Sequence, residues 1–225
     1  MKPVIIFGLG NIAEVIHYCI TNETDLKTAA FTVDKEFIKE EEFLGFKVIP
    51  FESIKEKYPP ADYDMFVALG YHQLNKVREE KVYEAKVKGY NMISVISKNS
   101  GIPANLDIGE NCFIMNNVCV HPKVKIGNNV FIWSGAVVGH HSDIGDNCWL
   151  TSGANIAGCV KIGKNCFFAI NSTVGDNVSI GNDCFIGANT LVTKNLADEK
   201  VVIQESTKEF RLNSKQFLKM FKSFY

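Results

Sequence analysis

Two adjacent histidines are the residues in this chain best suited to acid–base chemistry. His140 and His141 stand in the segment Val-Gly-His-His-Ser-Asp, which ends at Asp143. An imidazole with an ordinary pKa of about 6.5 can take a proton from an attacking amine or hydroxyl at neutral pH. The segment therefore predicts a general base at His140, with His141 as the alternative, and Asp143 is a candidate to orient the ring.

Metal binding is the competing interpretation of these histidines. His121 is the other candidate ligand, and zinc would need three well-spaced side chains. Adjacent residues on an extended corner point apart, so His140 and His141 suit one ion poorly. The seven cysteines contain no Cys-x-x-Cys pair, and none has a recognisable base beside it. We therefore expect no metal and no covalent cysteine intermediate, and a zinc protein or a non-catalytic scaffold is the weaker alternative.

A glycine-rich turn near the N-terminus predicts nucleotide binding. Gly8, Leu9, Gly10 and Asn11 follow an apolar segment and open a helical pattern, and Asp34 ends the next apolar segment. Glycines let a ligand approach the backbone, and a helix N-terminus attracts phosphate. Asp34 could accept from a ribose hydroxyl or a base N–H. About 90 residues make only half a dinucleotide fold, which disfavours a nicotinamide oxidoreductase; a purely structural turn is the other alternative.

An internal repeat must position the histidines. Ile-Gly pairs recur at a constant interval and begin at residues 108, 126, 144, 162 and 180. Within each interval a large aliphatic residue recurs at every sixth position, with a small residue four positions later. Six residues make one short strand and one turn, three such units close a triangular coil, and coils stack about 4.8 Å apart. The pattern predicts a parallel β-helix.

Counting in sixes places His140 at an outward corner of the coil. One full coil further on, the same corner carries Gly158 after Ala157. A glycine leaves room for a ligand against the backbone and offers an N–H to a developing oxyanion. The corner is therefore the predicted place of reaction.

The segments outside the coil lack the six-residue repeat. Residues 1–94 alternate strands with helices, which predicts a small parallel sheet covered by helices. Residues 95–195 are predicted to form the coil, and the tail at 196–225 is expected to cap its open end. The tail is basic and rich in phenylalanine from Ser206 onward, which predicts an amphipathic helix; a helix on a membrane surface is the alternative. The predicted strands are 3–7, 29–33, 46–49, 64–69 and 91–95, and the predicted helices are 11–20, 52–57 and 75–88.

Composition excludes several classes of protein. Hydrophobic residues make up 46% and charged residues 22% of the chain, and the net charge is −1. This charge gives no electrostatic basis for binding nucleic acid. No apolar run approaches the length of about 18 residues that a membrane span needs, and no signal peptide is recognisable. We expect a cytoplasmic protein.

The whole chain resembles the sialic-acid O-acetyltransferase superfamily of bacterial sugar acetyltransferases. The resemblance is carried by the glycine turn with Asp34, by the segment that includes Asn75 and Arg78, and by segments 134–145 and 186–194. It implies a left-handed β-helix, a homotrimer with active sites between subunits, and acetyl-CoA as co-substrate. It is similar in particular to the N-acetyltransferases of UDP-bacillosamine precursors, GDP-perosamine and dTDP-viosamine.

The resemblance also implies roles for individual residues. His140 matches the general base, whereas His141 stands where several members have an acid. Nucleotide-sugar binding is implied for Gly8, Leu9, Gly10, Asn11, Asp34, Asn75 and Arg78, and CoA binding for Ala157, Gly158, Gly175, Ala188 and Lys194.

These inferences together predict an acetyl-CoA-dependent N-acetyltransferase. Its substrate would be a dTDP-, UDP- or GDP-linked amino-dideoxy sugar used in surface polysaccharide synthesis, and the acetyl group would pass directly to the sugar amine. O-acetylation of a sialic acid or a related sugar is the alternative.

Overall fold

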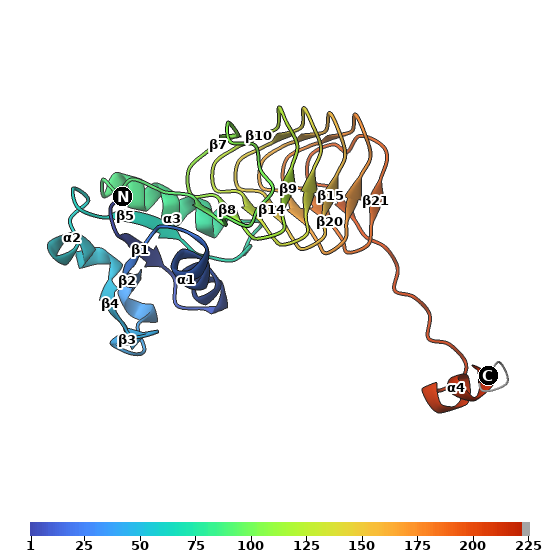
Figure 1. Cartoon of the computed structure of the whole chain (residues 1–225), viewed down its shortest axis with the longest axis horizontal. Coiled ribbons are helices and arrows are strands. Elements are labelled where there is room, and N and C mark those ends of the chain that lie inside the picture. Colours follow the sequence, from blue (N-terminus) through green and yellow to red (C-terminus); the bar gives the residue numbers. More distant parts are fainter. Residues whose placement is uncertain (222–225) are drawn as a thin grey trace.

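The computed structural model describes residues 1–221 and consists of a small α/β domain, a long triangular coil and a short terminal helix (Figure 1). The α/β domain lies against the first coils, and no flexible linker separates the two parts. The predicted fold class, a small α/β domain followed by a parallel β-helix, is confirmed.

The N-terminal sheet has the order β3-β4-β2-β1-β5 and is parallel except for β3. Its inner strands are almost wholly apolar because helices cover both faces; every residue of β1 is buried. The short strand β3, which has no apolar repeat to reveal it, was not predicted. The strands are β1 (Val4–Phe7), β2 (Thr28–Val33), β3 (Glu42–Phe43), β4 (Phe46–Pro50) and β5 (Asp64–Val67).

Three helices and two 3-10 turns connect these strands. They are α1 (Asn11–Glu23), η1 (Lys35–Phe37), η2 (Phe51–Ser53), α2 (Ile54–Lys57) and α3 (Lys76–Val87). Of the segments predicted as regular structure here, only 91–95 lacks its own strand: Met92 forms an isolated bridge with Met65, and the next strand begins at Val95.

The coil consists of very short strands stacked into three parallel sheets, and each strand pairs with its equivalent in the next coil. One sheet contains β7 (Asp107–Ile108), β10 (Lys125–Ile126), β13 (Asp143–Ile144), β16 (Lys161–Ile162) and β19 (Ser179–Ile180). A second contains β9 (Cys119–Val120), β12 (Val137–Val138), β15 (Asn155–Ile156), β18 (Thr173–Val174) and β21 (Leu191–Val192). The third contains β6 (Val95–Ile96), β8 (Phe113–Ile114), β11 (Phe131–Ile132), β14 (Trp149–Leu150), β17 (Phe167–Phe168), β20 (Phe185–Ile186) and β22 (Val201–Val202).

Residue type at each place of the hexapeptide explains the coil. The large aliphatic side chains fill the interior together with the small residues four positions later, and together they form one continuous buried cluster. Many turns need a left-handed residue, which asparagine tolerates. Gly139 is required for another reason, because a Cβ there would lie 2.5 Å from the carbonyl carbon of Ala157 in the next coil.

Aromatic side chains join the coil to the α/β domain. Phe113, Phe131, Trp149 and Phe167 project outward from the third sheet and belong to the same buried cluster as the core of the N-terminal domain. The rings of Phe131 and Trp149 are stacked with centroids 5.0 Å apart. One face of the coil is therefore an internal interface on which the N-terminal domain packs.

The end of the coil is covered on one side by the chain itself, because β22 pairs with β20. Beyond it, an extended segment leads to α4 (Ser214–Phe221), which lies away from the coil (Figure 1). Capping of the coil by this tail stays a proposal. Residues 222–225, which belong to the predicted tail, lie outside the described residues.

Candidate active site

His140 lies at a corner of the coil, as predicted, and lines a cavity of about 300 Å³. The cavity follows the sheet that contains β12, β15 and β18. Its other lining residues are His121, Val137, Gly139, Asn155, Ile156, Ala157, Gly158, Thr173, Val174 and Asp176. None of them comes from the N-terminal domain, so one chain by itself does not bring the predicted nucleotide turn to the histidine.

His141, and not Asp143, is the side chain that contacts His140. The two Nδ1 atoms are 3.2 Å apart, and the rings meet edge to face. His141 adopts a left-handed backbone conformation (φ 58°), which turns the chain sharply at this corner. Asp143 lies on β13 and lines a different cavity, together with His141, Lys123 and Lys125. Asp143 as the group that orients His140 is therefore not supported by this structure.

Gly158 supports the ring of His140, because a Cβ at this position would lie 2.8 Å from Cε1 and 2.9 Å from Nε2 of the imidazole. The backbone N–H of Gly158, however, donates to Oδ1 of Asp176 at 2.9 Å. This N–H is therefore already bonded to a side chain in this structure, and its contact with an oxyanion stays a prediction. Asp176 was missed by sequence reasoning, although it stands at the same corner, one coil after Gly158 and two coils after His140.

We expect Gly158→Ala to lower kcat at least tenfold with little change in the melting temperature. A Cβ at 2.8 Å from the imidazole forces the exposed His140 ring out of its position, and misplacement of a catalytic group by about 1 Å can cost about 100-fold. Steady-state kinetics measure the effect. Gly101→Ala is the matched control, because its Cβ would meet only ordinary contacts, the nearest at 3.6 Å. Equal activity of both variants would contradict the role of Gly158.

The other residues assigned to CoA binding are spread along the coil. Ala157 and Gly158 line the His140 cavity, whereas Gly175, Ala188 and Lys194 do not. Lys194 occupies the corner one coil after Asp176 and is exposed. These three residues stay predicted CoA contacts.

The glycine turn has the predicted strand-to-helix form. Gly8 adopts φ 132°, and a Cβ there would lie 2.9 Å from the carbonyl oxygen of Ala68, so the turn requires glycine. Gly10 caps α1, which begins at Asn11, and no side chain bonds to this end of the helix. The first N–H groups of α1 are therefore suited to donate to phosphate oxygens.

Asp34 lies at the end of β2, as predicted, but its carboxylate is already paired. Lys81 of α3 contacts both of its oxygens at 3.0 Å. Burial alone would lower the pKa of Lys81, but hydrogen bonds with Asp34 and Glu84 outweigh it and raise the pKa. Asp34 therefore ties α3 to the sheet, and its contact with a ribose stays a prediction.

The side chains of Asn75 and Arg78 are fully buried between α3 and the coil. The Arg78 guanidinium donates to Oδ1 of Asn129 at 2.9 Å, to the carbonyl oxygen of Asn129 at 3.0 Å and to Oδ1 of Asn75 at 2.9 Å. It also lies 4.2 Å from the ring centroid of Phe131. Burial lowers the pKa of Arg78 to about 9, so the group stays charged at neutral pH. In this structure these residues join the two domains, and their contact with a substrate stays a prediction.

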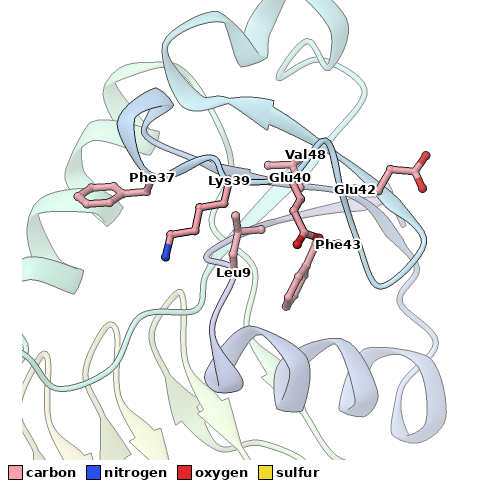
Figure 2. A pocket seen from close by; sticks show the side chains of 7 residues that line it. All are labelled: Leu9, Phe37, Lys39, Glu40, Glu42, Phe43 and Val48. Carbon is pink, nitrogen blue, oxygen red and sulfur yellow. The ribbon is translucent and has the colours of Figure 1, made fainter.

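A second cavity, of about 440 Å³, lies beside the glycine turn (Figure 2). Leu9 contributes to it from the turn, and Phe37, Lys39, Glu40, Glu42, Phe43 and Val48 complete the lining. Apart from Leu9, sequence reasoning missed this set, because the segment after Asp34 has no motif.

Four of the cysteines belong to the apolar core of the coil. Cys112, Cys148, Cys166 and Cys184 are buried in the coil interior, and burial raises the pKa of the Cys112 thiol to about 11. Among residues 1–221, no three His, Cys, Asp or Glu side chains come together as a metal site. Within the same residues, no helix is long and apolar enough to cross a membrane.

Comparison with known proteins relates the repeat of this chain to a family of bacterial transferases. The sequence pattern of the bacterial transferase hexapeptide family (six repeats) matches residues 105–140 and 162–194. No curated protein sequence matches the chain significantly.

Solved structures match nearly the whole chain. PerB from Caulobacter crescentus, in complex with CoA and GDP-perosamine, is 26% identical over 91% of this chain and 95% of its own, with a TM-score of 0.78. The acetyltransferase domain of PglB from Neisseria gonorrhoeae, in complex with acetyl coenzyme A, is 18% identical over 93% and 99%, with a TM-score of 0.80. WeeI from Acinetobacter baumannii is 20% identical over 91% and 97%, with a TM-score of 0.77. At these identities the last two establish the fold alone.

Three observations agree with the family that the sequence resembles. They are the hexapeptide repeat, the two-part fold and a histidine at the predicted corner of the coil. The chain carries the repeat of the bacterial transferase hexapeptide family on a two-part fold like that of PerB.

Proposed function

We propose that this protein transfers the acetyl group of acetyl-CoA to the amino group of a nucleotide-linked amino-dideoxy sugar. The observation that carries the proposal is the exposed His140 imidazole, which is held between His141 and Gly158 and faces a cavity of about 300 Å³. The likeness to PerB, solved with CoA and GDP-perosamine, supports the substrate class.

The histidine pair suits a base. In a neutral His140 that carries its proton on Nδ1, this N–H donates a hydrogen bond to Nδ1 of His141. Nε2 of His140 is then unprotonated and can accept a proton. The sugar amine attacks the thioester carbonyl carbon, and Nε2 takes the proton that the amine loses. The carbon–sulfur bond then breaks, and the imidazolium returns the proton to the leaving sulfur. The products are an N-acetylated sugar and CoA.

Asp176 adds a negative charge to the same cavity. Its carboxylate holds the Gly158 N–H and so fixes the peptide against which His140 rests.

The proposed site is completed by a second chain. The N-terminal domain packs on the sheet that contains β11 and β14, whereas the His140 cavity lies along the sheet of β12 and β15. The nucleotide held by one subunit would therefore meet His140 of another. We propose a homotrimer, which is expected as a single species of three chains in sedimentation equilibrium.

A thiol-release assay tests the proposal. Acetyl-CoA is combined with dTDP-, UDP- or GDP-linked 4-amino-4,6-dideoxy sugars, and each amine is compared with the same sugar carrying a hydroxyl at that carbon. Turnover of one amine, without turnover of its hydroxyl counterpart, is the expected result. Turnover of hydroxyl sugars or sialic acid alone would contradict N-acetylation and establish O-acetylation instead.

A further inference from the structure

The cavity beside the glycine turn has the composition of a base-binding site. It contains Leu9, whose neighbours Gly8 and Gly10 form the turn at which the nucleotide phosphates are proposed to bind. A base attached to that nucleotide would therefore reach this cavity. The inference rests on the proposed function and goes further, because it concerns which base is recognised.

Apolar side chains form the walls of the cavity. Val48 is buried and Phe43 half-buried, whereas Phe37 is 60% exposed and projects from the turn after Asp34. An exposed aromatic ring next to an apolar cavity offers a surface on which a flat base can stack. Every base can stack on an aromatic ring, so the apolar walls by themselves do not discriminate between one base and another.

Two charged side chains give the cavity a polar edge. Figure 2 shows the ammonium group of Lys39 and the carboxylate of Glu40 on either side of Leu9, with the carboxylate near Phe43, while the carboxylate of Glu42 is directed away. In the described part of the chain, neither Lys39 nor Glu40 takes part in a hydrogen bond or an ion pair. An acceptor and a donor are therefore both available to a ligand.

We propose that this edge selects guanine, with Glu40 as the specificity-determining residue. The N1–H and N2–H₂ groups of guanine lie side by side and can both donate to one carboxylate, and O6 beside them can accept from an ammonium group. Uracil and thymine present a single N–H flanked by two carbonyl oxygens. These oxygens are partly negative, so a carboxylate that approaches the N–H is repelled by them. Adenine offers only its amino group as a donor. The amino-sugar substrate that accepts the acetyl group would then be linked to guanosine diphosphate.

Calorimetric titration with GDP, ADP, UDP and dTDP tests the proposal in the wild type and in Glu40→Gln. We expect GDP to bind at least tenfold more tightly than UDP or dTDP, and the variant to lose most of this preference while keeping its affinity for UDP. Glu41→Gln is the matched control, because Glu41 is also exposed and does not line the cavity.

The outcomes separate the two proposals. Equal or tighter binding of UDP or dTDP by the wild type, or an unchanged GDP preference in Glu40→Gln, would overturn the guanine assignment. Acetylation of a dTDP- or UDP-linked amino sugar alone would also overturn it, while the proposed function would stand. If none of the four nucleotides binds and no amino sugar is acetylated, both proposals fail.

Discussion

His140→Ala is expected to lower kcat by about 10²–10⁴-fold, which is the usual contribution of a positioned general base. KM for acetyl-CoA should change much less, because the predicted CoA contacts along the coil are left intact by this substitution. His140 is exposed at a corner, so its truncation should leave the melting temperature within about 2 °C of the wild type. Thiol release with the best amino sugar measures the first effect, and thermal unfolding measures the second.

Two further histidine variants test the assignment. His141→Ala removes only the hydrogen-bond partner of His140, which is worth about 1 kcal/mol and predicts roughly a fivefold loss. His121 lines the same cavity, so its imidazole is tested as a further candidate base beside His141. A loss of two orders of magnitude in His121→Ala or His141→Ala, with His140→Ala active, would move the base to that residue.

Arg78→Met is expected to lower the free energy of unfolding by on the order of 3 kcal/mol. Methionine fills much of the volume, but the carbonyl oxygen of Asn129 and Oδ1 of Asn75 lose their buried donor. Urea unfolding measures the loss. The emission of Trp149 gives a local signal, because the guanidinium lies 5.1 Å from its ring centroid.

The same variant separates a structural role from substrate binding. If Arg78 only joins the domains, Arg78→Met measured well below its melting temperature should bind the nucleotide with nearly wild-type affinity. A large loss of affinity with unchanged stability would restore the role that the sequence implied. Arg211→Met, at an exposed arginine of the tail, is the control and should change neither quantity.

The sequence by itself determined the fold of the coil and the place of the candidate base. The hexapeptide period sets which side chains face inward, and the period of three hexapeptides sets which strands pair, so the register of Ile126 with Ile144 follows from counting alone. The same count places His140, Gly158 and Asp176 at one corner. The same count could have identified Asp176 as part of the site. Apart from its position in the repeat, nothing in the sequence around this aspartate indicates a functional role.

Only the tertiary structure decided how side chains meet outside the repeat. Asp143 and His141 are close in sequence, yet Asp143 sits on a strand beside the inward Ile144 and faces another cavity, while the left-handed backbone of His141 turns its ring to His140. The family resemblance implied that Arg78 binds the substrate, and the sequence around an arginine does not indicate whether its side chain is buried or exposed. Its burial arises from docking α3 on Phe131, a contact between segments of unrelated period that no local pattern encodes.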